Sequence, residues 1–230
     1  MIHQISRVCA AAVLTACLAA AQEPADPQPQ EESKRAFWIV PNYRTTPSLV
    51  NFEPVSDGEK FRLASEDAFD PGTFVLAGFF AGESQLTNQN KSFGQGAAGF
   101  GRYYGTAYAD LFIGDYMTEA VFPSLLHQDP RYFRKGTGST WSRLGYAASQ
   151  IFMTHTDTGR NQFNYSEIVG NSVAVAISTS YYKDNRTVGD GVSKLGLQLG
   201  VDMAANILKE FWPDLQHRLH RSRQRNPEAR

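Results

Sequence analysis

The chain is poor in cysteine, since only Cys9 and Cys17 carry a thiol among its 230 residues. Both lie within the first 21 residues, a segment with the pattern of an export signal. Cleavage after Ala21 would leave a mature protein with no thiol. Disulfides, thiolate metal sites and cysteine nucleophiles are therefore excluded from the mature protein that we predict.

The chain also lacks long apolar runs and an excess of charge of one sign. After residue 21, no segment offers the roughly 20 apolar residues that a conventional membrane-spanning helix needs, so we predict none. Lys and Arg total 22 against 23 Asp and Glu, a formal net charge of −1. This balance argues against a nucleic-acid partner. Walker A, G-x-S-x-G and H-E-x-x-H motifs are missing, and we predict no cofactor.

What the chain does have is an N-terminal export pattern. Arg7 precedes an apolar stretch from Val8 to Ala16, and small residues follow up to Ala21. These are the charged, apolar and small-residue parts of a secretory signal, so we expect an exported protein of the periplasm or outer membrane. Within the same segment, Leu14-Thr15-Ala16-Cys17 resembles the lipobox of bacterial lipoproteins, in which Cys17 is lipidated. Cleavage after Ala21 is the first interpretation and lipidation at Cys17 the alternative.

Composition divides the rest of the chain. Residues 22–36 are rich in Pro, Gln and Glu without an apolar pattern, which predicts a disordered spacer. Residues 37–213 form a single helical domain that begins with a short extended aromatic arm. Residues 214–230 are a basic tail that we expect to be disordered and solvated, with contact to anionic lipid as the alternative.

Helix start and stop signals recur through the domain. They are Ser56 with Glu59 before Lys60–Phe69, Asp70-Pro71 before Phe74–Leu86, a long helix from Gly96 to Phe122 that stops near Pro123, Ser139 before Trp141–Met153, Asn164 with Glu167 before Tyr165–Tyr182, and Thr187 or Asp190 before a last helix that ends at Pro213. The sequence therefore predicts an all-α fold, a compact bundle of about five helices.

Residues of one size recur every fourth position on these helices, which places each set along one side. The aromatic stripe is Phe100, Tyr104, Tyr108, Phe112 and Tyr116; the small-residue lanes are Ala97, Gly101, Gly105 and Ala109, then Gly170, Ala174 and Ser178, then Gly196, Gly200 and Ala204. Small residues let helix backbones approach closely, so we expect Gly- and Ala-mediated packing within the bundle. Contact with a membrane or a partner is the alternative. The stripe drifts around its helix and should contact two or more neighbours.

Side chains that could carry chemistry concentrate just past the long helix. His127 and Asp129 form a His-x-Asp pair that recurs at His155 and Asp157. Imidazoles and carboxylates can hold a metal ion or act as acid and base. The spacing matches no helical zinc motif, however, and Asp-Pro and Asp-Thr-Gly turns form without a ligand. A structural role is therefore the first interpretation, and a periplasmic hydrolase or metal-dependent enzyme is the alternative.

Asp115 and Glu119 are further weak candidates for a catalytic pair. They lie one helical turn apart, so their carboxylates share a face and would repel unless a cation lies near. The candidate cations are Arg102, Arg131, Arg134 and Arg143. A buried ion network is the commoner reason for such a pair.

Gly94, Gly96 and Gly99 match the G-x-G-x-x-G turn of dinucleotide sites, but polar residues precede them where a buried strand is required. We interpret these glycines as a loop and the start of the small-residue lane. The chain also resembles membrane acid phosphatases in Pro123-Ser124 and His127, followed by Ser142-Arg143 and His155. It departs from their motif because no glycine precedes His127, Ser142-Arg143 lies too far from His155, and Asp157 lies too close to it.

Several longer segments together resemble an uncharacterised family of exported bacterial proteins of the acidobacterial type. They are Pro41-Asn42-Tyr43-Arg44-Thr45, Gly58-Glu59-Lys60-Phe61, Gln95-Gly96 through Tyr108-Ala109-Asp110, Pro123 through Arg134, and Phe163-Asn164-Tyr165-Ser166-Glu167. The resemblance implies export and a shared fold, and it brings no activity or catalytic residue. We therefore expect a non-enzymatic envelope protein that contacts membrane lipid or an envelope protein through its small-residue and aromatic helix faces.

Overall fold

The computed structural model describes residues 35–36, 40–41, 45–46 and 52–225. The predicted signal segment, the lipobox at Cys17, most of the spacer and most of the aromatic arm lie outside these residues. Among the described residues, no helix is both long enough and apolar enough to cross a membrane.

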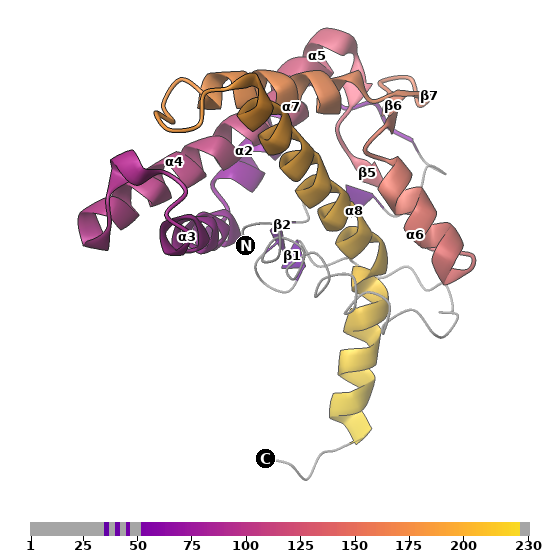
Figure 1. Ribbon diagram of the computed structural model, residues 1–230. Coiled ribbons are helices and arrows are strands. Elements are labelled where there is room, and N and C mark those ends of the chain that lie inside the picture. The colour runs from indigo at the N-terminus through magenta and orange to yellow at the C-terminus, as the bar shows by residue number, and fades with distance from the viewer. Residues whose placement is uncertain (1–34, 37–39, 42–44, 47–51, 226–230) are drawn as a thin grey trace.

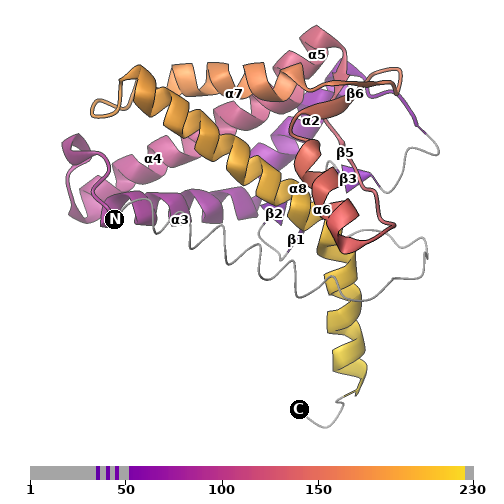
Figure 2. The same cartoon turned by 45° about the vertical axis from the view of Figure 1, so that its right-hand side comes forward.

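The fold is mainly helical, and its helices lie on either side of a long central one (Figure 1). The elements are α2 (Asp57–Ala68), α3 (Pro71–Leu86), η1 (Lys91–Phe93), α4 (Gly96–Asp115), η2 (Tyr116–Val121), α5 (Phe122–Leu126), α6 (Thr140–Ser149), α7 (Tyr165–Ser178) and α8 (Val188–Arg225). The central helix runs through α4, η2 and α5. Helices α2 and α3 pack on one side of it and α7 on the other, and α8 packs against α7 and α6 (Figure 2).

The predicted helix starts are confirmed by their caps. The Ser56 hydroxyl accepts from the backbone N–H of Glu59, and the Asp70 carboxylate accepts from that of Gly72 with Pro71 in the first turn. Ser139 and Asn164 cap α6 and α7 in the same way. Each cap satisfies a backbone donor that the first turn of a helix leaves without a partner, so these starts are set locally.

The central helix does not stop near Pro123, as the sequence predicted, but continues to Leu126. The reason is η2, a π-helical segment just before the proline. Proline at position 123 has no N–H to donate to the carbonyl of Glu119. The π-helical turn before it already departs from this pattern, because its N–H groups bond five residues back instead of four. The helix ends at His127, whose backbone is left-handed with φ of 54°.

Short strands correct the all-α prediction. A three-stranded antiparallel sheet joins β4 (Gln128–Asp129), β6 (Met153–Thr156) and β7 (Asn161–Phe163) in the order β4-β6-β7. β5 (Tyr132–Phe133) pairs in parallel with β3 (Thr45–Thr46), and β1 (Arg35–Ala36) pairs with β2 (Val40–Pro41). Residues 35 and 36 therefore belong to a strand, although we predicted them within the disordered spacer. Strand pairing also ends α6 at Ser149, where the sequence predicted helix as far as Met153.

The last helix continues through Pro213 to Arg225, so the predictions of an end at Pro213 and of a disordered tail from residue 214 are wrong for residues 214–225. The Arg143 guanidinium holds the helix on both sides of the proline. Its Nε donates to Glu210 Oε1 at 2.8 Å and its Nη1 donates to Asp214 Oδ2 at 2.5 Å. These contacts offset the backbone hydrogen bond that Pro213 cannot make.

The aromatic stripe of α4 packs on α2 and α3, so the prediction of two neighbours is confirmed. The Tyr104 hydroxyl donates to the Phe74 carbonyl at 3.2 Å, and the Tyr108 hydroxyl donates to the Ala68 carbonyl at 3.2 Å. Phe112 meets Phe69 edge-on, with ring centroids 5.8 Å apart. These contacts hold the α2–α3 pair against the central helix.

Only one of the small-residue lanes packs as predicted. A Cβ on Gly170 of α7 would lie 3.0 Å from the Met117 carbonyl oxygen, so α7 touches the backbone of the π-helix there. By contrast, a Cβ on Gly101, Gly105, Gly196 or Gly200 would meet no described atom within 4 Å. Within the described part of the chain, these glycines of α4 and α8 therefore do not mediate close packing.

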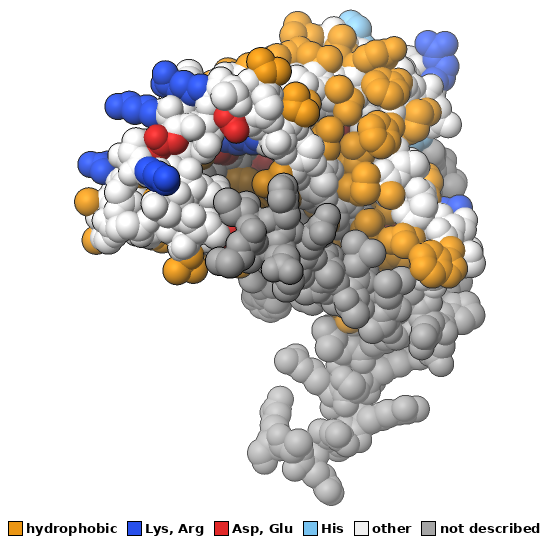
Figure 3. Space-filling view, viewed as in Figure 1, with side chains coloured by type: hydrophobic (Ala, Val, Ile, Leu, Met, Phe, Trp, Pro, Cys, Tyr) orange, Lys and Arg blue, Asp and Glu red, His pale blue; other side chains and the backbone are white. Residues whose placement is uncertain are grey.

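Burial in this fold runs against the usual segregation of side chains. Fully buried side chains include Lys60, Glu119, Asp129, Asn171 and Glu210, each at most 1% exposed. Large apolar side chains stand at the surface instead, on α3, α7, α8 and the β6–β7 hairpin. Figure 3 shows apolar side chains gathered from the end of α5 over the start of α7 towards α6. A patch of this kind marks an interaction surface in most proteins.

Candidate functional site

The fold brings the two His-x-Asp pairs together. In the β4–β6 ladder, Asp129 lies opposite His155. The backbone N–H of Asp157 donates to the His127 carbonyl at 2.9 Å, which extends the ladder by one step. The strand pairing that joins these residues is absent from the helical pattern of the sequence, which therefore did not show that they converge.

Both carboxylates of this cluster are engaged by buried or half-buried cations. Asp129 accepts from the backbone N–H of Arg131 at 2.9 Å and from its Nε and Nη2 at 3.0 and 2.7 Å. Asp157 pairs with Lys60 at 2.9 Å, and the fully buried Lys60 ammonium also donates to the Pro123 carbonyl at 3.2 Å. A carboxylate held in this way orders a turn and is poorly available as a base or ligand.

The imidazoles have opposite environments. The His127 side chain is 83% exposed and its Nδ1 lies 3.9 Å from Asp157 Oδ2. His155 is 4% exposed, its ring meets the Phe133 ring edge-on at 4.8 Å, and its buried Nδ1 has no hydrogen-bond partner among the described residues. Burial lowers the pKa of His155, although the charge of Asp129 opposes this shift. No group of three or more His, Cys, Asp or Glu side chains within the described part of the chain could hold a metal ion.

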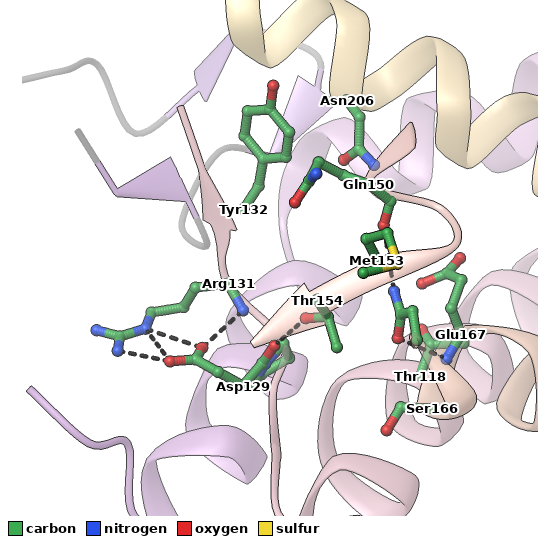
Figure 4. Close-up of a pocket in the computed structure, with 12 residues that line it drawn as sticks. Thr118, Asp129, Arg131, Tyr132, Gln150, Met153, Thr154, Ser166, Glu167 and Asn206 are labelled. Atoms are coloured by element: carbon green, nitrogen blue, oxygen red, sulfur yellow. Dashed lines mark hydrogen bonds and ion pairs between the residues drawn. The ribbon is translucent and has the colours of Figure 1, made fainter. Parts of the chain in front are cut away.

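A polar cavity of about 40 Å³ lies beside this cluster (Figure 4). Its lining includes Asp129, Thr154, Gln150, Glu167 and Asn206, so it joins β4, β6, α6, α7 and α8. Small-molecule sites usually offer about 300–1,000 Å³, and a polar space of this size holds a few water molecules. The cavity therefore fits internal solvation better than a substrate.

In the weak pair Asp115 and Glu119, Asp115 ends α4 and Glu119 is buried in the π-helix. Three of the arginines that we considered as their counter-ions bind other groups. Arg102 donates to the Phe93 carbonyl, Arg131 pairs with Asp129, and Arg143 pairs with Glu210.

Sequence reasoning missed the polar cluster around Glu210. This carboxylate is fully buried on α8 and accepts from the Tyr132 hydroxyl at 2.8 Å, the backbone N–H groups of Lys135 and Gly136 at 3.0 and 2.9 Å, and Arg143 Nε at 2.8 Å. Burial, with the Glu210 charge next in size, raises the pKa of Tyr132. The cluster fastens α8 to β5 and α6. The spacing of Glu210 and Asp214, one turn apart, was the signal available in the sequence.

A second missed cluster joins α4 to α8. The Asp110 carboxylate accepts from the hydroxyls of Tyr181 and Tyr182 and from Lys194 Nζ, the last two at 2.7 Å. Lys194 also donates to Ser178 Oγ and lies 4.1 Å from the centroid of the Tyr182 ring. Burial lowers the pKa of Lys194, and Asp110 counters that effect. The contact to these tyrosines also ends α7 at Ser178, short of the predicted Tyr182.

These clusters place the polar side chains of α7 and α8 on their inner faces. On α7, Asn171 Nδ2 donates to Glu167 Oε1 at 3.0 Å and reaches Asp202 Oδ2 of α8 at 3.3 Å. No exposed residue between 161 and 180 carries a charge, and none does between 187 and 201. Surface helices of globular proteins normally show the reverse arrangement.

We name the exposed side of this layer the apolar outer face. Its residues are Phe152, Met153 and Phe163 of the hairpin and the segment before it, Tyr165, Val169, Ala176 and Ile177 of α7, and Val188, Gly189, Val192, Ser193, Gly196, Leu197, Gly200 and Val201 of α8. The hairpin and α7 are continuous here, since the Phe163 and Tyr165 rings meet edge-on at 5.0 Å. The outer face carries no exposed charge along α7 and α8.

No family model matches the chain, and searches of curated proteins and of solved structures found no similar protein.

Proposed function

We propose that this chain is a non-enzymatic, exported protein of the cell envelope that docks on a membrane surface or an envelope partner through its apolar outer face. The observation that carries the proposal is the inverted polarity of α7 and α8. Asn171 of α7 and Asp202 of α8 meet between the helices and the half-buried Lys194 turns to Asp110, whereas the described exposed residues along both helices are uncharged and the carboxylate Asp190 caps the start of α8. Export is supported by the signal pattern of residues 1–21.

The exposed apolar side chains of α8 are unfavourable in water. Val192 and Val201 are 65% and 40% exposed, and Leu197 between them is 57% exposed. Each square ångström of apolar surface removed from water contributes about 25 cal/mol, so covering a multi-residue face stabilises a docked state by several kcal/mol. Ion pairs made inside the layer cannot compensate for this exposure. The outer face is therefore suited to being covered.

The alternative, a hydrolase or metal-dependent enzyme at His127, Asp129, His155 and Asp157, is less well supported by the geometry. Arg131 and Lys60 occupy the carboxylates, and the adjoining cavity is only about 40 Å³. The one observation in its favour is the buried Nδ1 of His155, which has no hydrogen-bond partner in the described part of the chain.

The proposal is tested by fractionating cells that express the full chain. We expect the protein to stay with the envelope after osmotic shock, and we expect Val192→Asp combined with Val201→Asp to shift it into the released fraction. Val75→Asp is the matched control, because Val75 of α3 is 56% exposed and lies outside the apolar outer face. All variants carry Cys17→Ser, which removes anchoring through a lipidated cysteine.

Release of the unaltered protein by osmotic shock as a monomer would contradict the proposal. Equal effects of the α8 double variant and of Val75→Asp would also contradict it, since the outer face would then have no special role. Circular dichroism and thermal unfolding of each variant show that a released protein is still folded.

A further inference from the structure

The apolar outer face is bordered by basic side chains at both ends of α7. Arg160 lies in the turn between β6 and β7, and Lys183 and Arg186 lie in the loop between α7 and α8; all three residues are exposed. Two acids lie near this loop: Asp184 accepts from the backbone N–H of Ser92 at 2.8 Å, and Asp190 accepts from the backbone N–H and the hydroxyl of Thr187. Figure 3 shows Lys and Arg at the left, with acidic side chains among them, and again at the upper right, with apolar side chains between the two groups.

The face offers few groups for recognising a protein. Protein interfaces carry about one hydrogen bond per 100–200 Å², set around an apolar centre. On α8, Ser193 is the one exposed residue from Val188 to Val201 whose side chain can form a hydrogen bond. Acyl chains require no such partners. Aromatic residues at the edge of the apolar outer face, among them Phe163 and Tyr165, suit the boundary between headgroups and acyl chains.

Charge distribution points the same way. The α7 helix has 14 residues, so its ends lie about 21 Å apart at 1.5 Å per residue. Arg160 lies a few residues before the start of α7, and Lys183 lies a few residues after its end. Both side chains are long enough to reach past the apolar surface. Cations at both ends of a neutral apolar surface complement anionic headgroups around an inserted patch.

We infer that the partner of the apolar outer face is a bilayer surface with anionic headgroups, an inference that rests on the proposed docking function. The protein lies on that surface with the outer face of α7 and α8 among the upper acyl chains. Arg160 and Lys183 contact the headgroups at the two ends of α7. Binding is interfacial, with the helix axes near the plane of the membrane.

The test is flotation of the purified full chain, carrying Cys17→Ser, with vesicles of phosphatidylcholine alone or mixed with phosphatidylglycerol. We expect stronger binding to the anionic vesicles and loss of this preference at high salt. Arg160→Gln with Lys183→Gln should lower affinity for the anionic vesicles about 25-fold, at about fivefold per basic group, and leave affinity for neutral vesicles unchanged.

Variants of the face test its location. Val192→Asp with Val201→Asp should lower binding to both kinds of vesicle about tenfold or more, because each charge enters an apolar boundary. Val75→Asp should leave binding unchanged. The lipid inference is overturned if the α8 double variant and Val75→Asp bind vesicles equally. It is also overturned if the double variant of Arg160 and Lys183 keeps its preference for anionic vesicles.

The inference can fail separately from the proposed function. If the protein does not float with either vesicle but stays with the envelope in a manner sensitive to Val192→Asp and Val201→Asp, docking stands and its partner is a protein. If it self-associates through this face, size-exclusion chromatography of the double variant shows a smaller species without any change in vesicle binding. Either result overturns the lipid inference and retains the docking face.

Discussion

The Glu210 cluster gives the sharpest prediction of stability. Replacing Glu210 with Gln keeps the shape of the side chain and removes its charge. The two carboxylate oxygens have different partners: Oε1 accepts from Gly136 N–H and Arg143 Nε, and Oε2 accepts from the Tyr132 hydroxyl and Lys135 N–H. One amide cannot serve both sets, because its NH₂ group is a donor.

The cost follows from these contacts. If the glutamine oxygen keeps the Oε1 partners, its NH₂ group faces the Tyr132 hydroxyl, which can turn to accept, and the Lys135 N–H, which cannot. A buried N–H left without an acceptor costs about 1–3 kcal/mol. Arg143 loses one of its two anionic partners and keeps Asp214. Breaking a buried ion pair typically costs about 3–5 kcal/mol, and we expect Glu210→Gln to destabilise the protein by that amount.

Urea unfolding followed by circular dichroism measures this change. With an m-value of about 2 kcal/mol/M, the midpoint should fall by about 1.5–2.5 M. Arg62→Gln is the control, because Arg62 forms ion pairs with Glu59 and Glu66 on the exposed side of α2 and should contribute less than about 1 kcal/mol. A loss below about 1 kcal/mol in Glu210→Gln, at an unchanged m-value, would refute the reasoning.

Two further predictions concern the sheet and the small-residue lanes. Burial lowers the pKa of His155 from 6.5, so the unfolded state binds a proton at this imidazole more readily than the folded state does. The stabilising contribution of the neutral imidazole is therefore present above pH 6.5 and is lost as the pH falls below it. Urea midpoints between pH 7.5 and 5 should show this loss in the unaltered protein and in His127→Gln, a change at an exposed site, but not in His155→Phe. Gly170→Ala should lower the melting temperature, at a cost of about 1–3 kcal/mol, because its Cβ would press on the Met117 carbonyl. Gly196→Ala, whose Cβ meets no described atom, should increase the free energy of unfolding by about 0.5–1 kcal/mol and so raise the melting temperature, and a gain at both sites would contradict the close approach at Gly170.

Among the candidate site residues, the sequence identified groups that do gather, and it did not show how they are used. Asp129 lies opposite His155 in the sheet, and Asp157 follows β6 beside His127. The cation of Asp157 comes from a distant position, since Lys60 reaches it from α2, whereas the cation of Asp129 is Arg131, two residues along the chain. No periodicity links Lys60 with Asp157, and only the fold makes them neighbours.

The sequence by itself determined the helix starts and the predominantly helical class. The caps at Ser56, Asp70, Ser139 and Asn164 are made within a few residues of the chain, so local chemistry is sufficient. The ends were less predictable. A strand pairing ends α6, and a guanidinium from α6 carries α8 through Pro213, both of which are long-range contacts.

Only the tertiary structure decided which side of each helix faces inward. Four-residue spacing places Gly196 and Gly200 on one side of α8, and it places Lys194, Gln198 and Asp202 on another, without saying which side is buried. The polar side is buried because its charges find partners on α4 and α7, whereas Gly196 and Gly200 face open space among the described residues. A sequence pattern records that a helix has two kinds of face, and the partners available in the fold determine which one meets the surroundings.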